Sequence, residues 1–500
     1  MKKRRAKRLI AVLTALVIVF VSLSAYLGVR VLTLEKQLSE AEKTIRETAE
    51  AGAAQEQQPV VLMTEEEALA NAGEGGGTEE NGAAQTETAP AGGISEAPGD
   101  PALPTVSAEE NPGSGIASGS GAQPGTPETA DGNAVFDPKA EESNDGKIEE
   151  EARAMLEGMS LEQKVGQLFF VTPEALTGAG QVTRAGDATR EAVRRYAVGG
   201  IIYFQQNLID PGQTKALLAG TKDIYEELGL PEPFLTTDEE GGSVVRIADN
   251  PAFDAENVGD MKDLGALGDP AAAEEAGRTI GSYMAALGFN MDFAPVADVL
   301  TNPSNTVVAK RAFGSDPQLV KECVTAESDA MMQEGILPVW KHFPGHGSTE
   351  ADTHAGYAYT DKSMEELLAE DLVPYENAKE HAPCIMAAHI SLPNAGGNDL
   401  PATLSENIIT GLLREQLGYE GVVITDALNM GAVANNYSSA DAAERAIQAG
   451  CDMLLMPYSF SSAYEGVLSA VRSGTITEER IDASVMRILR CKIRMRKTRK

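Results

Sequence analysis

Apolar and polar residues follow a repeating pattern from about Lys147 onward. Short apolar runs, typical of buried strands, alternate with longer segments in which apolar residues recur at helical spacing. The strands are predicted at residues 167–171, 200–204, 234–237, 293–299, 337–341, 384–390, 422–425 and 453–456. The helices between them are predicted at residues 187–196, 212–228, 270–287, 317–334, 363–380, 406–417 and 439–449.

This alternation predicts an α/β domain, because strands joined by helices pair in parallel through right-handed crossovers. Eight strands within residues 147–492 match a single-domain (β/α)8 TIM barrel, a fold that typically has about 200 to over 400 residues. An open doubly wound sheet is the alternative fold. Its dinucleotide-binding form is disfavoured, since no Gly-x-Gly-x-x-Gly motif follows the first predicted strand.

A long apolar run lies near the start of the chain. Leu9 to Val29 is almost wholly apolar and follows a basic tip, and its length fits one membrane crossing, which needs roughly 20 residues. We therefore expect residues 1–33 to form a cytoplasmic tip and a transmembrane anchor, with the catalytic domain outside the cytoplasm. A cleaved signal peptide and a secreted domain are the alternative, since Ser22-Leu23-Ser24 offers small residues at cleavage-like spacing.

Between the anchor and the α/β domain the composition changes twice. Apolar residues at helical spacing predict a short juxtamembrane helix over residues 34–50. Residues 51–146 are rich in Gly, Ala, Pro and Glu and nearly lack aromatic residues. Such a segment buries too little apolar area to offset its chain entropy, so we expect a disordered acidic linker. A basic tail is expected over residues 493–500.

Charge and cysteine content exclude several classes of protein. The formal net charge is −34, which disfavours nucleic acid as a partner because phosphate contacts need clustered Lys and Arg. The four cysteines are widely spaced and form no Cys-x-x-Cys motif. Cys384 and Cys451 lie among apolar residues, so buried free thiols are expected rather than a disulfide framework. The oligomeric state stays open.

Ionisable residues follow the predicted strands. At the carboxyl ends of barrel strands, polar side chains line the active site, and a charge at the end of an apolar strand is costly to bury without a partner. Structural ion pairs are the alternative explanation for any one of these residues. The residues concerned are Asp238, Glu239, Glu240, Asp298, Lys341, His342, His389 and Asp426.

The segment from Lys341 to His354 holds three of the five histidines. His342 and His346 have the spacing of a metal-binding helix, but Pro344 and Gly345 break that helix and Lys341 repels a cation. We therefore expect no metal and no cofactor.

Asp352 and His354 lie two positions apart, so they share one side of an extended segment. A carboxylate beside an imidazole fixes its tautomer and raises its basicity, which suits a general acid/base. An ordinary solvated loop is the alternative. Asp426 follows an apolar strand, where a carboxylate can serve as the nucleophile of glycosyl transfer.

Together these segments resemble glycoside hydrolase family 3, specifically its bacterial β-N-acetylglucosaminidase (β-hexosaminidase) branch, over residues 149–490. The first segment is Lys341-His342-Phe343-Pro344-Gly345-His346-Gly347, followed by Asp352-x-His354. The others are Thr237-Asp238-Glu239-Glu240-Gly241-Gly242, Phe293-Ala294-Pro295-Val296-Ala297-Asp298-Val299, Lys310-Arg311-Ala312-Phe313-Gly314 and Ile424-Thr425-Asp426-Ala427-Leu428-Asn429-Met430. Departures at Ser243, Ser348 and Thr353 bear on specificity rather than on the chemistry.

The resemblance implies roles for particular residues. Asp426 is expected to be the nucleophile and His354 the acid/base, with Asp352 as its partner. The residues expected to hold the sugar in the −1 subsite, next to the cleaved bond, are Asp238, Arg246, Arg311, Lys341 and His342. The second α/β domain of many family β-glucosidases is expected to be absent.

The predicted activity is retaining exo-hydrolysis of terminal β-linked N-acetylglucosamine (GlcNAc) from cell-wall or related glycans such as muropeptides. A β-glucosidase, a β-xylosidase or a GlcNAc phosphorylase are the enzymatic alternatives, because a neutral histidine lets an anion such as phosphate approach. A metal-dependent hydrolase is a further alternative. A non-catalytic glycan-binding module is the alternative from another class.

Overall fold

The computed structural model describes residues 138–349, 358–396 and 399–498. The expected anchor, juxtamembrane helix and nearly all of the acidic linker lie outside these residues, as do Asp352, Thr353 and His354. Within the described part of the chain, no helix is both long enough and apolar enough to span a membrane.

Two four-stranded parallel sheets form the centre of the domain. The first has the order β10-β1-β2-β3 and the second the order β4-β5-β7-β9. The strands are β1 Phe169–Val171, β2 Gly200–Ile202, β3 Phe234–Thr236, β4 Met291–Asp292, β5 Leu337–Phe343, β7 Cys384–Ala387, β9 Val422–Thr425 and β10 Leu454–Leu455. A separate parallel pair joins β6 Ala358–Tyr359 to β8 Ile390–Ser391. The predicted α/β class with parallel strands is confirmed.

Backbone hydrogen bonds also link the two sheets to each other. Between β3 and β4, the Asn290 amide donates to the Leu235 carbonyl at 3.2 Å and the Phe293 amide to the Thr237 carbonyl at 3.1 Å. Next to β9 and β10, the Thr425 amide donates to the Met453 carbonyl at 2.9 Å. The outer strands of the two sheets are therefore joined by backbone hydrogen bonds, β3 to β4 and β9 to β10.

The strand predicted at residues 293–299 is not a regular strand in the structure, where β4 ends before it. Regular pairing covers only Met291–Asp292, because Pro295 has no amide hydrogen to donate to a ladder. Beyond the strand, the Val339 amide donates to the Ala294 carbonyl at 2.7 Å and the Ala297 amide donates to the Lys341 carbonyl at 2.6 Å. This segment therefore still runs beside β5 and carries Asp298 to the end of that strand.

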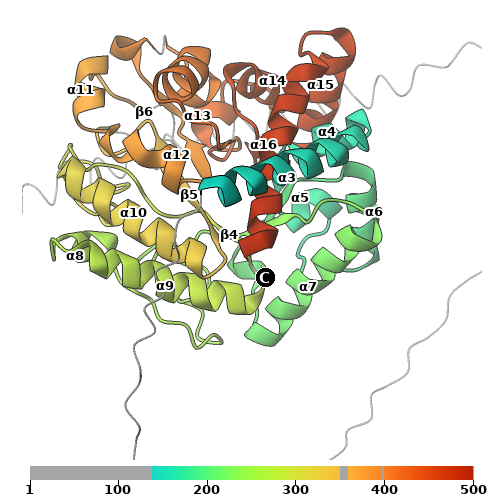
Figure 1. Ribbon diagram of the computed structural model, residues 1–500, viewed down its shortest axis with the longest axis horizontal. Helices are drawn as coiled ribbons and strands as arrows, with labels where there is room; N and C mark the ends of the chain where they lie inside the picture. The colour runs from blue at the N-terminus through green and yellow to red at the C-terminus, as the bar shows by residue number, and fades with distance from the viewer. Residues whose placement is uncertain (1–137, 350–357, 397–398, 499–500) are drawn as a thin grey trace, which may run out of the picture. The chain divides into compact units, whose positions relative to one another are not determined.

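Helices surround the strands (Figure 1). The larger ones are α6 Asp187–Tyr196, α7 Pro211–Glu227, α9 Pro270–Leu287, α10 Pro317–Gln333, α14 Ser439–Ala449, α15 Phe460–Ser473 and α16 Glu478–Thr498. Shorter ones are α4 Leu161–Gln167, α5 Pro173–Thr177, α8 Met261–Gly265 and α13 Gly431–Ala434, with short 3-10 turns at Gln205–Asn207, Pro393–Ala395 and Ala402–Leu404. Three helices begin with an Asp-Pro pair in which the aspartate accepts a hydrogen bond from the first turn; the caps are Asp210, Asp269 and Asp316. This is a local signal, since the cap satisfies a free amide and proline lacks one.

Two predicted helices are irregular. The single helix expected at residues 363–380 is wrong: the structure has α11 Met364–Ala369, a 3-10 turn Val373–Asn377 and α12 Ala378–His381. Pro374 lies inside the predicted span and cannot donate a helical hydrogen bond. The helix expected at 406–417 is present as a π-helix, Asn407–Gln416.

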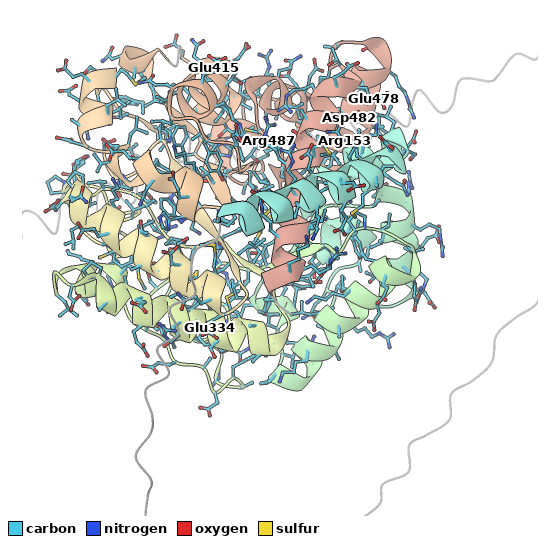
Figure 2. The ribbon with its side chains drawn as sticks, in the orientation of Figure 1. Arg153, Glu334, Glu415, Glu478, Asp482 and Arg487 are labelled. Atoms are coloured by element: carbon cyan, nitrogen blue, oxygen red, sulfur yellow. The ribbon has the colours of Figure 1, made fainter. Side chains whose placement is uncertain are left out.

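Helices from the two ends of the described chain lie together. α3 Pro138–Glu157 packs against α16 (Figure 1), and Arg490 Nε lies 2.6 Å from Glu149 Oε2. On α16, Glu478 and Asp482 each lie 2.8 Å from Lys164 Nζ of α4 (Figure 2). The helices extend beyond both predicted limits, since α3 begins before Lys147 and α16 continues past residue 492.

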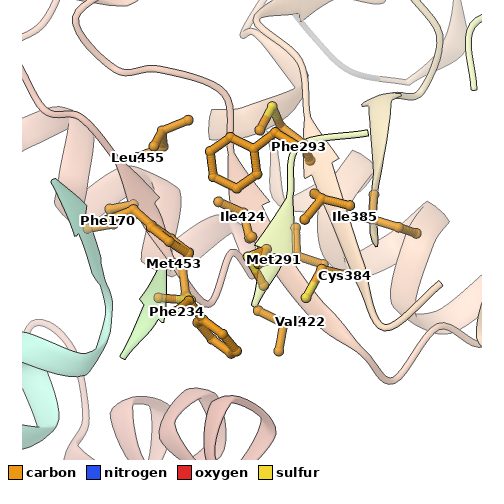
Figure 3. Packing of buried hydrophobic residues seen from close by; sticks show 14 of the residues in the cluster. Phe170, Phe234, Met291, Phe293, Cys384, Ile385, Val422, Ile424, Met453 and Leu455 are labelled. Atoms are coloured by element: carbon orange, nitrogen blue, oxygen red, sulfur yellow. The ribbon is translucent and has the colours of Figure 1, made fainter. Parts of the chain in front are cut away.

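The core lies between the strands and contains large apolar side chains (Figure 3). The Phe170 ring stacks on Phe234 at 5.9 Å between centroids and meets Phe293 edge-on at 5.5 Å. A Cβ on Gly200 would lie 2.1 Å from the Phe170 ring, so only glycine fits there. All four cysteines are buried and free, which confirms the prediction made for Cys384 and Cys451.

Candidate active site

The ionisable residues named from the sequence lie after or within parallel strands. Asp238 and Glu240 follow β3, Lys341 and His342 lie in β5, and Asp426 follows β9. Because the strands are parallel, all of these residues lie at the carboxyl ends of the sheets. The structure therefore brings the described members of the predicted site to one side of the domain.

A buried cluster of opposite charges forms the centre of this site. Lys341 Nζ lies 2.5 Å from Glu240 Oε1 and 3.1 Å from Asp238 Oδ1. Arg311 donates two hydrogen bonds to the Glu240 carboxylate, from Nε at 2.7 Å and from Nη2 at 2.8 Å. Arg246 Nη2 lies 3.5 Å from Asp238 Oδ2. The side chains of Asp238 and Arg246 are 19% and 26% exposed, so these two form the open edge of the cluster.

The cluster keeps its members charged. Burial alone raises the pKa of Glu240, but the Arg311 and Lys341 cations outweigh it and hold that pKa well below its ordinary value. Burial lowers the pKa of Lys341, and the Glu240 and Asp238 carboxylates raise it above its ordinary value overall. Glu240 was not among the predicted sugar-binding residues. The sequence shows that Glu240 follows a predicted strand, next to Asp238 and Glu239. It does not show that Arg311 and Lys341, which lie far along the chain, pair with Glu240.

Asp298 organises the histidine segment. One carboxylate oxygen lies 2.7 Å from His342 Nδ1, and the other accepts the His346 amide at 2.6 Å. His342 Nδ1 therefore donates to this carboxylate, and His342 Nε2 lies 3.3 Å from Arg311 Nη2. Burial raises the pKa of Asp298, but His342 and His346 bring it below its ordinary value. Burial lowers the pKa of His346, which favours its neutral form.

Glu239 holds the loop that carries Arg246. Its carboxylate accepts the backbone amides of Arg246, Ile247 and Ala248 at 2.6, 2.9 and 2.9 Å. The Tyr283 hydroxyl donates to the same carboxylate at 2.9 Å. Because this buried carboxylate accepts four hydrogen bonds, three of them from the loop, the backbone position of Arg246 is fixed by Glu239.

Asp426 lies just beyond β9 and is partly exposed. Its amide donates to the Ala387 carbonyl at 2.8 Å, and its Oδ1 accepts the Ala427 amide at 2.7 Å. Burial raises the pKa of Asp426, but His389, His342, the Ala427 amide and Lys341 together bring it below its ordinary value. Asp426 is therefore an ionised carboxylate at neutral pH.

The chain on both sides of residues 350–357 is tied to the same region. Asn305 Nδ2 donates to the carbonyls of His346 at 2.8 Å and Thr349 at 3.1 Å. After that segment, Lys362 pairs with the buried Asp371 and with Glu370 at 2.7 Å. The attachment points of the segment that carries Asp352 and His354 are therefore fixed.

The acidic and histidine side chains also bear on metal binding. No group of three or more His, Cys, Asp or Glu side chains there has an arrangement that could hold a metal ion.

One buried carboxyl group near the site has no hydrogen-bond partner among the residues that the structure describes. Both oxygens of Glu327 on α10 lack such a partner there, and the side chain is 1% exposed. Burial, followed by the negative charge of Glu240, raises the pKa of Glu327 to about 8, although Lys341 opposes the shift.

This raised pKa predicts a pH-dependent loss of stability. Folded Glu327 keeps a proton between pH 4.5 and about 8, where the unfolded chain has released it, so its contribution to stability falls as pH rises through that window. The loss amounts to roughly 3–5 kcal/mol, at about 1.4 kcal/mol per pKa unit. We expect urea denaturation at pH 5, 6.5 and 8 to show that the free energy of unfolding of Glu327→Met increases relative to that of the unsubstituted chain as pH rises.

The exposed Glu322 on the same helix gives a matched control. Glu322→Met should leave the pH dependence of stability unchanged. A Glu327→Met variant whose stability runs parallel to that of the unsubstituted chain at all three pH values would mean that Glu327 is already ionised in the fold.

The structure is an α/β domain with ionisable residues gathered at the carboxyl ends of its parallel strands, and comparison identifies its family. The model of the glycosyl hydrolase family 3 N terminal domain matches residues 160–491, and the chain belongs to this family. The resemblance seen in the sequence is thus confirmed.

Several known proteins are similar to this chain. β-Hexosaminidase A of Pseudoalteromonas piscicida is 33% identical over 334 residues, which cover 61% of this chain and 55% of that protein. β-Hexosaminidase LpqI of Mycobacterium tuberculosis is 33% identical over 319 residues, covering 61% of this chain and 78% of that one. The solved family 3 β-N-acetylglucosaminidase of Paenibacillus sp. str. FPU-7 is 38% identical with a TM-score of 0.64, covering 68% of this chain and 64% of that structure. This chain therefore spans little more than half of the first of these relatives.

Proposed function

We propose that the protein is a retaining exo-β-N-acetylglucosaminidase that removes terminal β-linked GlcNAc from glycans. The similar proteins bear the names β-hexosaminidase and β-N-acetylglucosaminidase. The observation that carries the proposal is the ionised, partly exposed Asp426 at the same strand ends as the buried Lys341–Glu240–Arg311 cluster. A carboxylate nucleophile beside a fixed set of donors and acceptors is what glycosyl transfer requires.

We further propose that the eight central strands close into a (β/α)8 barrel. The hydrogen bonds between β3 and β4, and between the ends of β9 and β10, support closure. In such a barrel the loops after the strands form the active site, which agrees with the positions of Asp238, Lys341 and Asp426.

In the proposed first step, Asp426 attacks the anomeric carbon as the bond to the glycosidic oxygen breaks. His354 gives its proton to that oxygen, with Asp352 holding the imidazole. A water molecule then attacks the same carbon, His354 takes one of its protons, and the bond to Asp426 breaks. Two displacements at one carbon give retention. The motif Asp352-x-His354 supports the acid/base assignment.

The proposed sugar-binding residues are Asp238, Arg246, Arg311, Lys341 and His342. Asp238 and Arg246, at the open edge of the cluster, are suited to hydrogen-bond hydroxyl groups. Lys341 is 3% exposed and Arg311 16% exposed. Because their partners hold them in place before the sugar arrives, little side-chain entropy is lost on binding.

We also propose that the domain acts outside the cytoplasm on cell-wall or related glycans, anchored by residues 9–29. The apolar run after the basic tip supports this placement. Retention of the protein in the membrane pellet after alkaline carbonate washing is expected. Release into the supernatant would favour a secreted, cleaved form.

A panel of p-nitrophenyl glycosides tests the activity. The full chain is expected to cleave the β-GlcNAc glycoside at least about 100-fold faster than the glucoside or xyloside, since unpaired polar groups in a site reject the wrong sugar. The first product seen by NMR should be the β-anomer of GlcNAc. Adding phosphate or EDTA should change neither the rate of cleavage nor the product.

Each other result of this panel identifies one alternative. Preference for the glucoside or xyloside indicates a glucosidase or xylosidase, and sugar phosphate formed with phosphate indicates a phosphorylase. Loss of activity with EDTA indicates a metal-dependent hydrolase. GlcNAc-glycan binding without any turnover indicates a binding module.

A further inference from the structure

Phe204 is an aromatic residue beside the site that has no role in the function proposed above. It lies shortly after β2 and directly precedes the 3-10 turn Gln205–Asn207. Its side chain is half-buried and packs against the apolar core. The guanidinium carbon Cζ of Arg246 lies over its ring, 5.8 Å from the ring centroid. A cation within about 6 Å of the centre of an aromatic ring is attracted to the face of that ring.

The polar contacts of the Arg246 side chain are long. Nη1 lies 3.2 Å from the carbonyl oxygen of Val245, and Nη2 lies 3.5 Å from Asp238 Oδ2. The commonest N–H···O distance is about 2.9–3.0 Å, and the Arg246 side chain is 26% exposed, so water competes for these donors. Glu239 fixes the backbone of Arg246 through its amide, which leaves the orientation of the long side chain to these contacts and to the Phe204 ring.

The position of Phe204 is set independently of Arg246. The Phe204 amide donates to Asn207 Oδ1 at 2.9 Å, and the Phe204 carbonyl accepts the Asn207 amide at 2.8 Å. Asn207 is 0% exposed, and its Nδ2 donates to Glu174 Oε1 at 2.6 Å and to the Val182 carbonyl at 2.9 Å. Because buried hydrogen bonds are costly to leave unmade, this network fixes the backbone from which the ring projects.

The loops that carry the ring and the cation are also joined to each other. Asn250, on the loop of Arg246, donates from Nδ2 to the carbonyl oxygen of Leu208, on the loop of Phe204, at 2.8 Å. The ring and the guanidinium therefore approach each other from connected backbone segments. A side chain that is ordered before its ligand arrives loses less conformational entropy on binding, so a fixed ring beside Arg246 favours binding of the sugar.

We propose that Phe204 is a positioning residue, whose ring holds the Arg246 guanidinium in the orientation that binds the sugar. The inference rests on the proposed role of Arg246 in the −1 subsite. The ring acts through Arg246, whose N–H groups donate to the hydroxyl groups of the sugar. Loss of the ring therefore lowers kcat/KM, while the acid and basic limbs of the pH profile stay in place, because neither the nucleophile nor the acid/base is altered.

A double-mutant cycle on kcat/KM tests whether the ring acts through Arg246. With p-nitrophenyl β-GlcNAc and the full chain, Phe204→Leu is expected to lower kcat/KM by about 3- to 30-fold, the range of a cation–π contact. Arg246→Met should lower it by about 10- to 100-fold, as when hydrogen bonds from a charged group are lost. In the Arg246→Met chain, Phe204→Leu should cost at most about twofold more. An equal loss in both backgrounds, or no loss in the unsubstituted chain, would overturn the proposal.

Conservative variants separate positioning from a loss of packing. Phe204→Tyr keeps an aromatic face and should stay within about twofold of the unsubstituted chain in kcat/KM, since both rings attract the cation. Thermal melts identify the variants that fold. If Phe204→Leu does not fold, Phe204→Met, whose side chain has a similar volume to leucine, takes its place in the cycle. A folded Phe204→Tyr variant as impaired as Phe204→Leu contradicts the role of the ring face.

Arg195 provides a matched control. Its Cζ lies 4.8 Å from the centroid of the Tyr196 ring, at the end of α6 that leads into the amino end of β2. Arg195→Met therefore removes a comparable pair away from the carboxyl ends of the strands and should leave kcat/KM unchanged. The two proposals fail in different ways. A chain that cleaves no GlcNAc glycoside refutes the proposed function, whereas an active chain in which the losses of Phe204→Leu and Arg246→Met are additive refutes only this inference.

Discussion

Asp426→Ala is expected to abolish cleavage of p-nitrophenyl β-GlcNAc, with kcat reduced by about 10⁴-fold or more, as when a nucleophile is removed from other enzymes. The reason is that no other described carboxylate combines its partial exposure with a pKa lowered by His389, His342 and Lys341. The fold should survive, because among the described residues the Asp426 side chain accepts one hydrogen bond, from the Ala427 amide. Loss of such a bond costs about 1 kcal/mol.

Rescue by azide separates a nucleophile from a merely structural residue. The alanine variant leaves space for a small anion, which can attack the anomeric carbon from the face that Asp426 occupied. A single displacement inverts the configuration, so α-glycosyl azide is the expected product. Asp441→Ala, on the surface of α14, serves as the control and should keep full activity. Full activity in Asp426→Ala would refute the assignment.

Lys341→Met should reduce both activity and stability. The substitution removes a cation that is 3% exposed and leaves Glu240 with Arg311 as its remaining cationic partner in the cluster. Removing one member of a buried ion pair costs about 3–5 kcal/mol. We expect the lower part of that range, since Arg311 still holds Glu240 by two hydrogen bonds. We also expect kcat/KM to fall by about 10²- to 10³-fold, as when one donor to a transition state is lost.

A double variant distinguishes the two effects. Lys341→Met combined with Glu240→Gln removes the uncompensated charge, so part of the lost stability should return while activity stays low. Thermal melts and kinetics of the single and double variants measure this. Lys321→Met, which breaks a surface pair with Glu376 at 2.8 Å, is the control and should cost at most about 1 kcal/mol. If Lys341→Met is as stable and active as the unsubstituted chain, the cluster has no role in catalysis.

Local signals made the order of the elements predictable. Helices at Asp187–Tyr196, Pro270–Leu287 and Ser439–Ala449 have the predicted bounds, and in two of them a capping Asp or Ser marks the start. The strand containing Pro295 was misjudged, and the helix containing Pro374 was broken, because hydropathy does not register a missing backbone donor.

The sequence by itself already predicts which residues carry the chemistry. Lys341, His342 and Asp426 follow or end apolar runs, where burying a charge without a partner is costly. The family motif gives each of these residues an expected role. Tertiary structure alone decided their ionisation. Glu240 is held as an anion by Lys341 and Arg311. A pKa depends on charges and hydrogen bonds within a few ångströms, and here these come from segments far apart in the chain, which no local pattern of residues brings together.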